Sequence, residues 1–211
     1  MAGYFVAMKL ALTYDDGPEP PWTEQMLDVL AEYDAPATFF VMARRAITHR
    51  HLIERMAAEG HEIGFHCLEH TRHSEMTAEE VAADTETGLE LLASIGVVPS
   101  IWRAPWGVVT DATLDVAWDH GLALCGWNFD SHDWRGDSRA EMVDALERQG
   151  GLRDGTIALM HDGLGPGVRR NGCEETVRLT STLLDLGADS AFTPVTVSDV
   201  LTPAPVGDPA R

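Results

Sequence analysis

The chain has 211 residues, of which 45% are hydrophobic, and its 34 acidic against 15 basic residues give a formal net charge of −19. This length supports a single domain with a sizeable core, and no apolar run approaches the ~20 residues that a membrane-spanning helix needs. The acidity, with no basic patch to offset it, argues against nucleic acid and anionic membranes as partners and favours a substrate that is neutral or becomes cationic.

Segments rich in β-branched and aromatic residues alternate with amphipathic helical segments along the chain. The predicted strands cover residues 9–14, 37–42, 61–66, 98–104, 123–129, 156–162 and, as a candidate seventh, 192–197. The predicted helices cover about 22–33, 47–59, 77–95, 110–119, 138–148 and 174–186. Thr77 and Glu80 form a capping box at the start of the third helix, and Thr110 or Asp111 is the expected cap of the fourth.

This alternation of strands and helices predicts a parallel sheet with right-handed crossovers, either a barrel or an open doubly wound sheet. No GxGxxG or Walker sequence follows the first strand, which removes the main argument for a nucleotide-binding open sheet. We expect one domain over residues 1–202 and a disordered tail over residues 203–211. In both architectures ligand sites lie at the carboxyl ends of the strands.

Two signals bear on where the protein works. The three cysteines are widely spaced and form no CxxC pair, so they indicate neither a disulfide framework nor a cysteine zinc site. The first residues, MAGYFVAMKLALTYDDG, contain no positively charged leader and no cleavage signal. We therefore expect a cytoplasmic protein, or a secreted one if a leader preceded this sequence and was removed.

Reactive residues collect at five predicted strand ends, of which those after the first and third strands suggest a metal site. LTYDDGPEP places Asp15 and Asp16 side by side, although neighbouring carboxylates repel and a turn needs only one aspartate. HCLEH places His66 and His70 four residues apart, a spacing that brings two imidazoles within reach of one cation on a helical turn. A solvated turn and a chance histidine pair are the structural alternatives, which a carboxylate arriving from the first strand makes less favourable.

The remaining three strand ends carry a cation, two carboxylates and a histidine. WRAPWG contains Arg103, whose guanidinium either lies on the surface or keeps a nearby aspartate ionised and oriented. NFDSHDWRG contains Asp130 and Asp133 in a loop with Trp134, and LMHDG places His161 at the mouth of an apolar strand. A histidine in that position is usually structural, but opposite an Asp–His–His cation it is a natural proton donor.

The ordered motifs TYDDGP, HCLEH, RAPWG, DSHDW and LMH resemble those of the polysaccharide deacetylases, carbohydrate esterase family 4, also called the NodB homology domain. APATFFV, GHEIGFH and DGTIALMHD around them agree with this resemblance, which runs from about residue 9 to residue 201. It implies a distorted (β/α) barrel with about seven parallel strands. The implied activity is that of a metal-dependent hydrolase that removes an N-acetyl group from an amino sugar.

The resemblance also assigns roles to residues. The implied metal ligands are Asp16, His66 and His70, for one divalent ion, with zinc expected and cobalt or nickel as alternatives. The implied catalytic residues are Asp15 as general base, His161 as general acid, Arg103 to hold Asp15, and Asp133 to orient His161. The implied substrate-binding residues are Pro105, Trp106, Trp134 and Leu159.

Several positions depart from the family pattern, namely Tyr14 in place of Phe, Cys67 in place of Ser or Thr, and Ala104 and Trp106 in place of the Pro and Tyr of RPPYG. The bulkier indole is expected to reshape the substrate floor, and a different neighbour of a histidine ligand can alter metal preference. None of the seven metal or catalytic side chains is missing.

The residues leave the substrate open between an N-acetylated oligosaccharide or polymer and a small acetylated metabolite. Removal of O-acetyl groups, as from acetylxylan, is the alternative reaction on the same fold. Three further readings have less support: a sugar-binding module without activity, a ferrous iron site of two histidines and a carboxylate, and hydrolysis of a cyclic amide as in allantoinase-like relatives. The iron reading leaves Asp15, Arg103 and His161 without a role. No oligomeric state is indicated.

Overall fold

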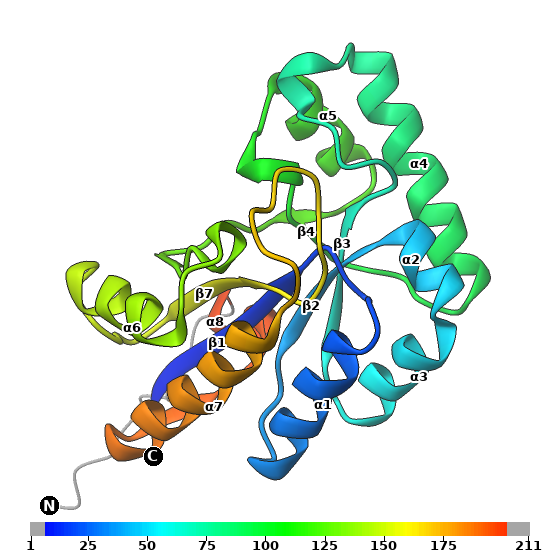
Figure 1. The fold of residues 1–211 in the computed structure, drawn as a ribbon. Helices are drawn as coiled ribbons and strands as arrows, with labels where there is room; N and C mark the ends of the chain where they lie inside the picture. Colours follow the sequence, from blue (N-terminus) through cyan, green and yellow to red (C-terminus); the bar gives the residue numbers. More distant parts are fainter. Residues whose placement is uncertain (1–6, 202–211) are drawn as a thin grey trace, which may run out of the picture.

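The computed structural model describes residues 7–201, which form one parallel sheet wrapped by helices (Figure 1). The described strands are β1 (Met8–Asp15), β2 (Thr38–Met42), β3 (Glu62–Cys67), β4 (Ile101–Trp102), β5 (Ala123–Leu124), β6 (Phe129–Asp130), β7 (Thr156–His161) and β8 (Phe192–Pro194). Seven of them follow the order β5-β4-β3-β2-β1-β7-β6, and β8 pairs with the start of β1. The sheet curls into a barrel that stays incomplete, because its two edge strands, β5 and β6, do not pair within the described residues. The expected distorted barrel of about seven parallel strands is confirmed.

Seven α-helices lie between the described strands, and an eighth follows the last of them. They are α1 (Trp22–Glu32), α2 (Ala43–Thr48), α3 (Arg50–Ala58), α4 (Ala78–Ser94), α5 (Asp111–Asp119), α6 (Arg139–Arg148), α7 (Glu174–Asp189) and α8 (Val197–Leu201). Three short 3-10 helices, η1 (His73–Glu75), η2 (Pro105–Gly107) and η3 (Asp133–Arg135), lie in the loops. Over residues 7–201, every helix is too short or too polar to cross a bilayer.

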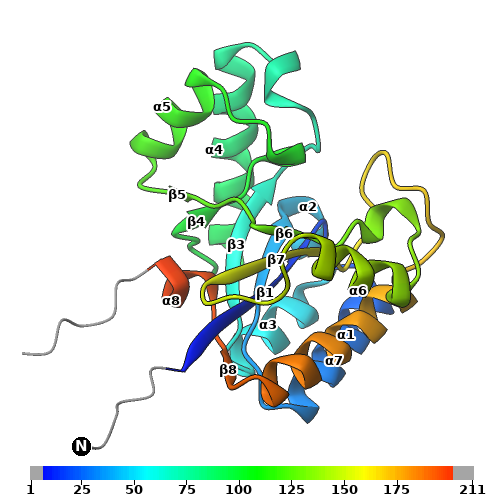
Figure 2. The ribbon, with the colours of Figure 1, turned by 90° about the vertical axis from the view of Figure 1, so that its left-hand side faces the viewer.

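The core lies on both faces of the central strand β1. Alternate residues Leu10, Leu12 and Tyr14 pack into the larger apolar cluster together with residues of α1 and α7. Ala11 belongs to a second cluster on the opposite face, which includes Val197 of α8. Figure 2 shows α1, α3 and α7 on one side of β1 and α8 on the other. Because β1 is buried in the middle of the sheet, its carboxyl end is held at the centre of the barrel mouth.

Three segments differ from the predicted elements. The prediction of a single strand over 123–129 is wrong, because this apolar run divides into two strands at the two edges of the sheet. β5 pairs with β4, and β6 pairs with β7. The predicted helix 47–59 divides into α2 and α3 at His49, whose backbone (φ −115°, ψ 44°) is not helical. The predicted strand 192–197 ends at Pro194, and α8 begins three residues later.

The predicted helix caps can also be compared with the structure. The capping box of Thr77 and Glu80 is present at the start of α4, and Thr110 rather than Asp111 caps α5. The tail predicted to be disordered, residues 203–211, lies outside the described residues.

Candidate active site

The sheet register brings the predicted reactive residues to one end of the barrel. Asp15 at the end of β1 pairs with His161 at the end of β7, so these two side chains start from adjacent strands. Phe65 of β3 pairs with Trp102 of β4, so the residues that follow them, His66 and Arg103, are also neighbours. Because these residues all lie at the carboxyl ends of neighbouring parallel strands, the sheet brings together groups that are far apart in the sequence.

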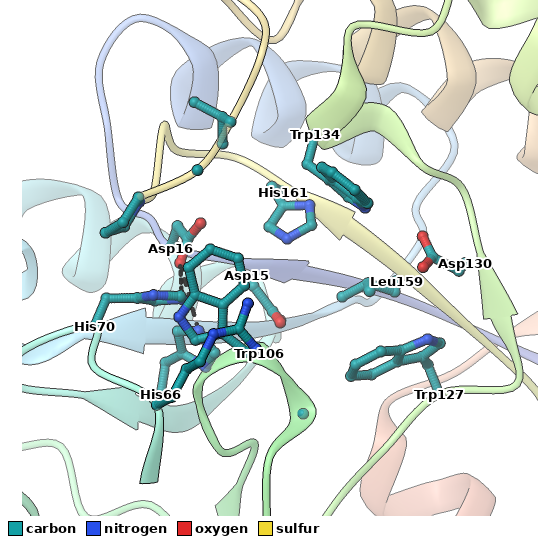
Figure 3. A pocket seen from close by; sticks show the side chains of 15 residues that line it. Asp15, Asp16, His66, His70, Trp106, Trp127, Asp130, Trp134, Leu159 and His161 are labelled. Atoms are coloured by element: carbon teal, nitrogen blue, oxygen red, sulfur yellow. Dashed lines mark ion pairs between the residues drawn. The ribbon is translucent and has the colours of Figure 1, made fainter. Parts of the chain in front are cut away.

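Asp16, His66 and His70 form a cluster whose ligand atoms all lie within 4.8 Å of one another. The Nε2 atoms of His66 and His70 lie 3.4 and 3.2 Å from the same oxygen, Oδ1 of Asp16 (dashed lines in Figure 3). Nδ1 of His66 donates a hydrogen bond to the carbonyl oxygen of Arg103 at 2.7 Å, which leaves Nε2 to face the carboxylate. Two imidazoles and one carboxylate thus converge on a single point.

The chemistry of this cluster fits a divalent cation. Oδ1 of Asp16 is buried and has no hydrogen-bond partner among the described residues. A carboxylate oxygen that faces two imidazole nitrogens is costly unless a proton or a metal ion lies between them. Burial alone would raise the pKa of Asp16, but the two imidazoles and the charge of His161 hold that pKa well below its ordinary value. The carboxylate is therefore ionised and available as a ligand.

The loop after β7 closes one side of the cluster. It extends beyond the end of the sheet as the long segment before α7 (Figure 1). A Cβ added at Gly165 would lie 2.0 Å from Oδ2 of Asp16, so only glycine allows the loop to approach this carboxylate. Asp16 itself has a left-handed backbone with φ 74°. Both features indicate that the carboxylate is held in a fixed position.

Asp15 is buried beside this cluster and is held by Arg103. The Nη1 atom of Arg103 donates to Oδ1 of Asp15 at 2.8 Å and to Oγ1 of Thr13 at 2.7 Å. Its Nη2 atom donates to the carbonyl oxygen of Gly126 at 2.9 Å, and the guanidinium lies 4.1 Å from the ring centre of Phe40. With Arg103 fixed on several sides, one oxygen of Asp15 is anchored and the other remains for the pocket.

His161 lies on the opposite side of the pocket and is oriented by Asp133. Oδ1 of Asp133 is 2.7 Å from Nδ1 of His161, and its Oδ2 accepts hydrogen bonds from the His161 backbone N–H, Arg170 and Thr176. Burial by itself lowers the pKa of His161, but the charge of Asp133 and its hydrogen bond outweigh this and raise the pKa to about 9. The same contacts hold the pKa of Asp133 well below its ordinary value, despite burial. His161 is therefore protonated at neutral pH, with Nε2 free of Asp133.

These groups line a pocket of about 300 Å³ (Figure 3). Its walls are formed by Asp15, Asp16, His66, His70, Arg72, Trp106, Gly107, Trp127, Asp130, Trp134, Leu159, His161, Pro166, Gly167 and Val168. The ring of Trp106 meets that of His70 edge-on, with centroids 5.2 Å apart. Trp106, Trp127 and Trp134 thus offer flat apolar faces against which a sugar ring can stack.

Three of the four predicted substrate-binding residues, Trp106, Trp134 and Leu159, line this pocket. Pro105 does not: it is buried at the start of η2 and is absent from the pocket walls. The role of Pro105 in substrate binding therefore stays a prediction. Arg103 and Asp133 also lie behind the pocket walls, each in contact with the residue it was predicted to hold.

Several site residues were not predicted. Arg170 and Thr176 bind Asp133, but they come from the loop and helix after the last motif, where no strand end marks them. Trp127 lines the pocket because the chain crosses the barrel mouth between β5 and β6. Arg72 lies two residues after His70, and that proximity is the one signal that could have identified it.

Comparisons with known proteins agree with this geometry. The family model described as polysaccharide deacetylase matches residues 6–125. A chitooligosaccharide deacetylase of Bradyrhizobium sp. (strain ANU 289) is 36% identical over 169 residues, which are 79% of this chain and 76% of that protein. A peptidoglycan-N-acetylglucosamine deacetylase of Bacillus cereus is 31% identical over 194 residues, 91% of this chain and 87% of that protein.

Solved structures share the fold as well. A structure described as T48 deacetylase with substrate matches with a TM-score of 0.80 and 30% identity, over 92% of this chain and 90% of that chain. The chain therefore belongs to the polysaccharide deacetylase family of hydrolases.

Proposed function

We propose that this protein is a metal-dependent hydrolase that removes the N-acetyl group from an amino sugar. One observation carries the proposal: a single pocket joins the Asp16–His66–His70 cluster to an anchored carboxylate, Asp15, and to a protonated imidazole, His161. Amide hydrolysis needs an activated water, a stabilised oxyanion and a proton for the leaving amine. The names of the related deacetylases support the same reaction.

Asp16, His66 and His70 would hold the cation, for which we propose zinc, with cobalt or nickel as alternatives. When bound there, a divalent cation lowers the pKa of a coordinated water towards neutrality and polarises the acetyl carbonyl. His66 is pre-oriented for this role by its bond to the Arg103 carbonyl. Burial tends to lower the pKa of His66, but the charges of Asp15 and Asp16 raise it overall, so cation binding must displace a proton at acid pH.

Asp15 acts as the general base. Arg103 fixes its Oδ1, so the other carboxylate oxygen accepts the proton of the attacking water without a change of rotamer. The guanidinium is itself locked by Thr13, the Gly126 carbonyl and the ring of Phe40. This preorganisation keeps the base within the pocket throughout the reaction.

His161 acts as the general acid. Its pKa of about 9 keeps the imidazolium protonated at neutral pH, and Asp133 holds Nδ1 so that Nε2 gives its proton to the departing nitrogen. The resulting amine leaves through an open pocket whose tryptophan walls bind the sugar ring.

The substrate class that we propose is an N-acetylated sugar of the chitooligosaccharide or peptidoglycan type, or a small acetylated metabolite. The test compares acetate release by the wild type and by Asp15→Asn from N-acetylated chitooligosaccharides and from acetylxylan, with zinc supplied. We expect the wild type to deacetylate the chitooligosaccharides faster, and the variant to lose turnover on both. Preference for acetylxylan would assign the reaction to O-acetyl esters, whereas an Asp15→Asn enzyme with full activity would overturn the proposed mechanism.

A further inference from the structure

Arg72 occupies a distinctive position at the rim of the pocket. It lies between the ligand His70 and the helix η1, and it is one of the pocket-lining residues. Its guanidinium carbon sits 4.0 Å from the ring centroid of Trp106. Trp106 in turn meets the ring of His70 edge-on and would clash with a Cβ at Gly167. The guanidinium is thus stacked on an aromatic ring that is itself fixed on two other sides.

The hydrogen-bonding edge of this guanidinium is open. Among the described residues no hydrogen bond involves the Arg72 side chain, and its one ion pair, to Glu75 in η1, is 3.9 Å long. The Glu75 side chain of that pair is largely exposed and the Arg72 side chain partly so, and the attraction between them is therefore weak. A guanidinium presents a planar fork of five N–H donors that matches a carboxylate or a phosphate. Stacking restricts its motion in advance and so reduces the entropy lost when an anion binds.

The acidic groups around Arg72 would not exclude an anion, because two of them are paired with arginines and Asp16 would be compensated by the cation proposed for its cluster. Glu69 is paired with Arg44 at 2.6 Å, and Asp15 is paired with the buried Arg103. Asp130, by contrast, lies across the pocket from His70 (Figure 3). Asp130 therefore does not neutralise Arg72, whose one ion pair among the described residues is with Glu75.

We propose that Arg72 is a specificity residue that binds an oxyanion, a carboxylate or a phosphate, carried by the acetylated sugar. This inference rests on the proposed function and narrows its substrate class to acetylated amino sugars with a negative group close to the acetamido carbon. It also runs against the expectation of a neutral substrate, because the net charge of −19 describes the whole chain whereas recognition depends on the local cation. A fixed cation is most useful in such an acidic protein, where the overall field repels anions.

The test compares substrates matched in size that differ in one anionic group. The first pair is the disaccharide of two N-acetylglucosamines against N-acetylglucosaminyl-N-acetylmuramic acid, which adds a carboxylate. The second pair is N-acetylglucosamine against its 1-phosphate. We expect the wild type to prefer the anionic member of at least one pair by about tenfold in kcat/KM, as charge-assisted hydrogen bonds imply. The pair that shows the preference identifies the oxyanion.

Arg72→Gln should abolish that preference, because kcat/KM for the anionic sugar should fall about tenfold more than kcat/KM for the neutral sugar. Arg72→Lys should retain part of it, because the charge remains while the planar fork is lost. Arg135→Gln is the matched control: Arg135 lies 5.9 Å from the ring of Trp134, pairs with Asp137 at 2.6 Å and does not line the pocket. This control should leave the preference intact.

Two results would overturn the proposal. One is a wild type that favours the neutral member of both pairs. The other is an Arg72→Gln variant that loses neutral and anionic activity equally, which would limit Arg72 to packing against Trp106. If none of these sugars releases acetate, the proposed function fails. The anion subsite at Arg72 is then tested by calorimetric titration of the protein with the two anionic sugars. About tenfold weaker binding to Arg72→Gln than to the wild type supports the subsite, and equal binding refutes it.

Discussion

Two aspartate–histidine clusters lie at the same end of the barrel, and they differ in how fully their hydrogen bonds are satisfied. Oδ1 of Asp16 faces two imidazoles but has no hydrogen-bond partner among the described residues. Asp133, equally buried, receives hydrogen bonds on both of its oxygens, from His161 twice and from Arg170 and Thr176. The hydrogen bonding of Asp16 is left incomplete, whereas that of Asp133 is completed by other residues of the chain. We therefore call Asp16, His66 and His70 the incomplete cluster, and Asp133 with His161 the completed cluster.

This difference separates the two roles that an ionised buried carboxylate can have. Asp133 is stabilised by the protein's own cations, so it can fix the orientation and raise the pKa of a neighbouring imidazole. Asp16 needs an external cation to compensate for its burial together with two imidazoles. We therefore propose that similar residue types at adjacent strand ends are divided between cation binding and proton donation. The predictions below test this division.

The largest effect is expected from His66→Ala, which removes a ligand from the incomplete cluster. Metal content, measured by mass spectrometry after dialysis, should fall to background, and acetate release should drop by roughly 10⁴-fold, since Lewis-acid activation is worth several kcal/mol. His73→Ala is the matched control, because His73 is also buried and follows the same motif but bonds Thr113 instead. Equal metal loss in both variants would contradict the assignment of His66.

His161→Ala should have the next largest effect, and it should act on turnover alone. Removal of a general acid typically lowers kcat on the order of 10²–10³-fold. Metal content should stay at that of the wild type, because His161 belongs to the completed cluster. Loss of the metal in this variant would show that the two clusters are not functionally separate.

Asp133→Asn should shift the pH profile. The raised pKa of His161, about 9, means that the protonated acid is present below that pH and is lost as pH rises through it. Without the charge of Asp133 the pKa returns towards ~6.5 or lower, which leaves roughly thirtyfold less protonated acid at pH 8. The alkaline limb of kcat should move to lower pH, with a smaller loss of activity at pH 6. A limb that does not move would refute the role of Asp133.

The same pair makes a prediction about stability. A raised histidine pKa contributes stability that is present below the ordinary histidine value and disappears as pH rises through about 9. The lowered pKa of Asp133 contributes stability above its ordinary value, which is lost at strongly acid pH. Denaturant unfolding of wild type and Asp133→Asn between pH 6 and 10 should therefore converge as the pH increases.

The smallest effect is expected from Gly165→Ala. The new Cβ would lie 2.0 Å from Oδ2 of Asp16, so the loop or the carboxylate must move, and metal affinity should fall by about tenfold. Gly126→Ala is the control, since a Cβ there meets no atom within 4 Å. Unchanged metal affinity in Gly165→Ala would show that the loop adapts without disturbing Asp16.

Much of the fold and site could be predicted because the chemistry follows the strand ends. Asp15, His66 and His161 each sit where a strong apolar strand stops, and parallel pairing brings such positions together. The parallel sheet followed from the alternation of elements, and the barrel and the family from five motifs in order. These features depend on local pattern and on sheet topology, both of which the sequence records.

The remaining features depend on contacts that no local pattern records. Arg170 reaches Asp133 from an irregular loop, and Trp127 enters the pocket only because one apolar run divides between two sheet edges. Pro105 was placed in the pocket by its neighbours in the motif, whereas the left-handed backbone at Trp106 exposes the indole and leaves the proline buried. Such details are set by tertiary packing.

The most direct test of the central claim is a metal titration of the chelator-treated protein, followed by acetate release from an N-acetylated chitooligosaccharide. We expect no turnover in the metal-free protein and full recovery at one zinc ion per chain. Turnover by protein shown by mass spectrometry to be metal-free would contradict it, because Asp15 and His161 alone would then suffice for the reaction.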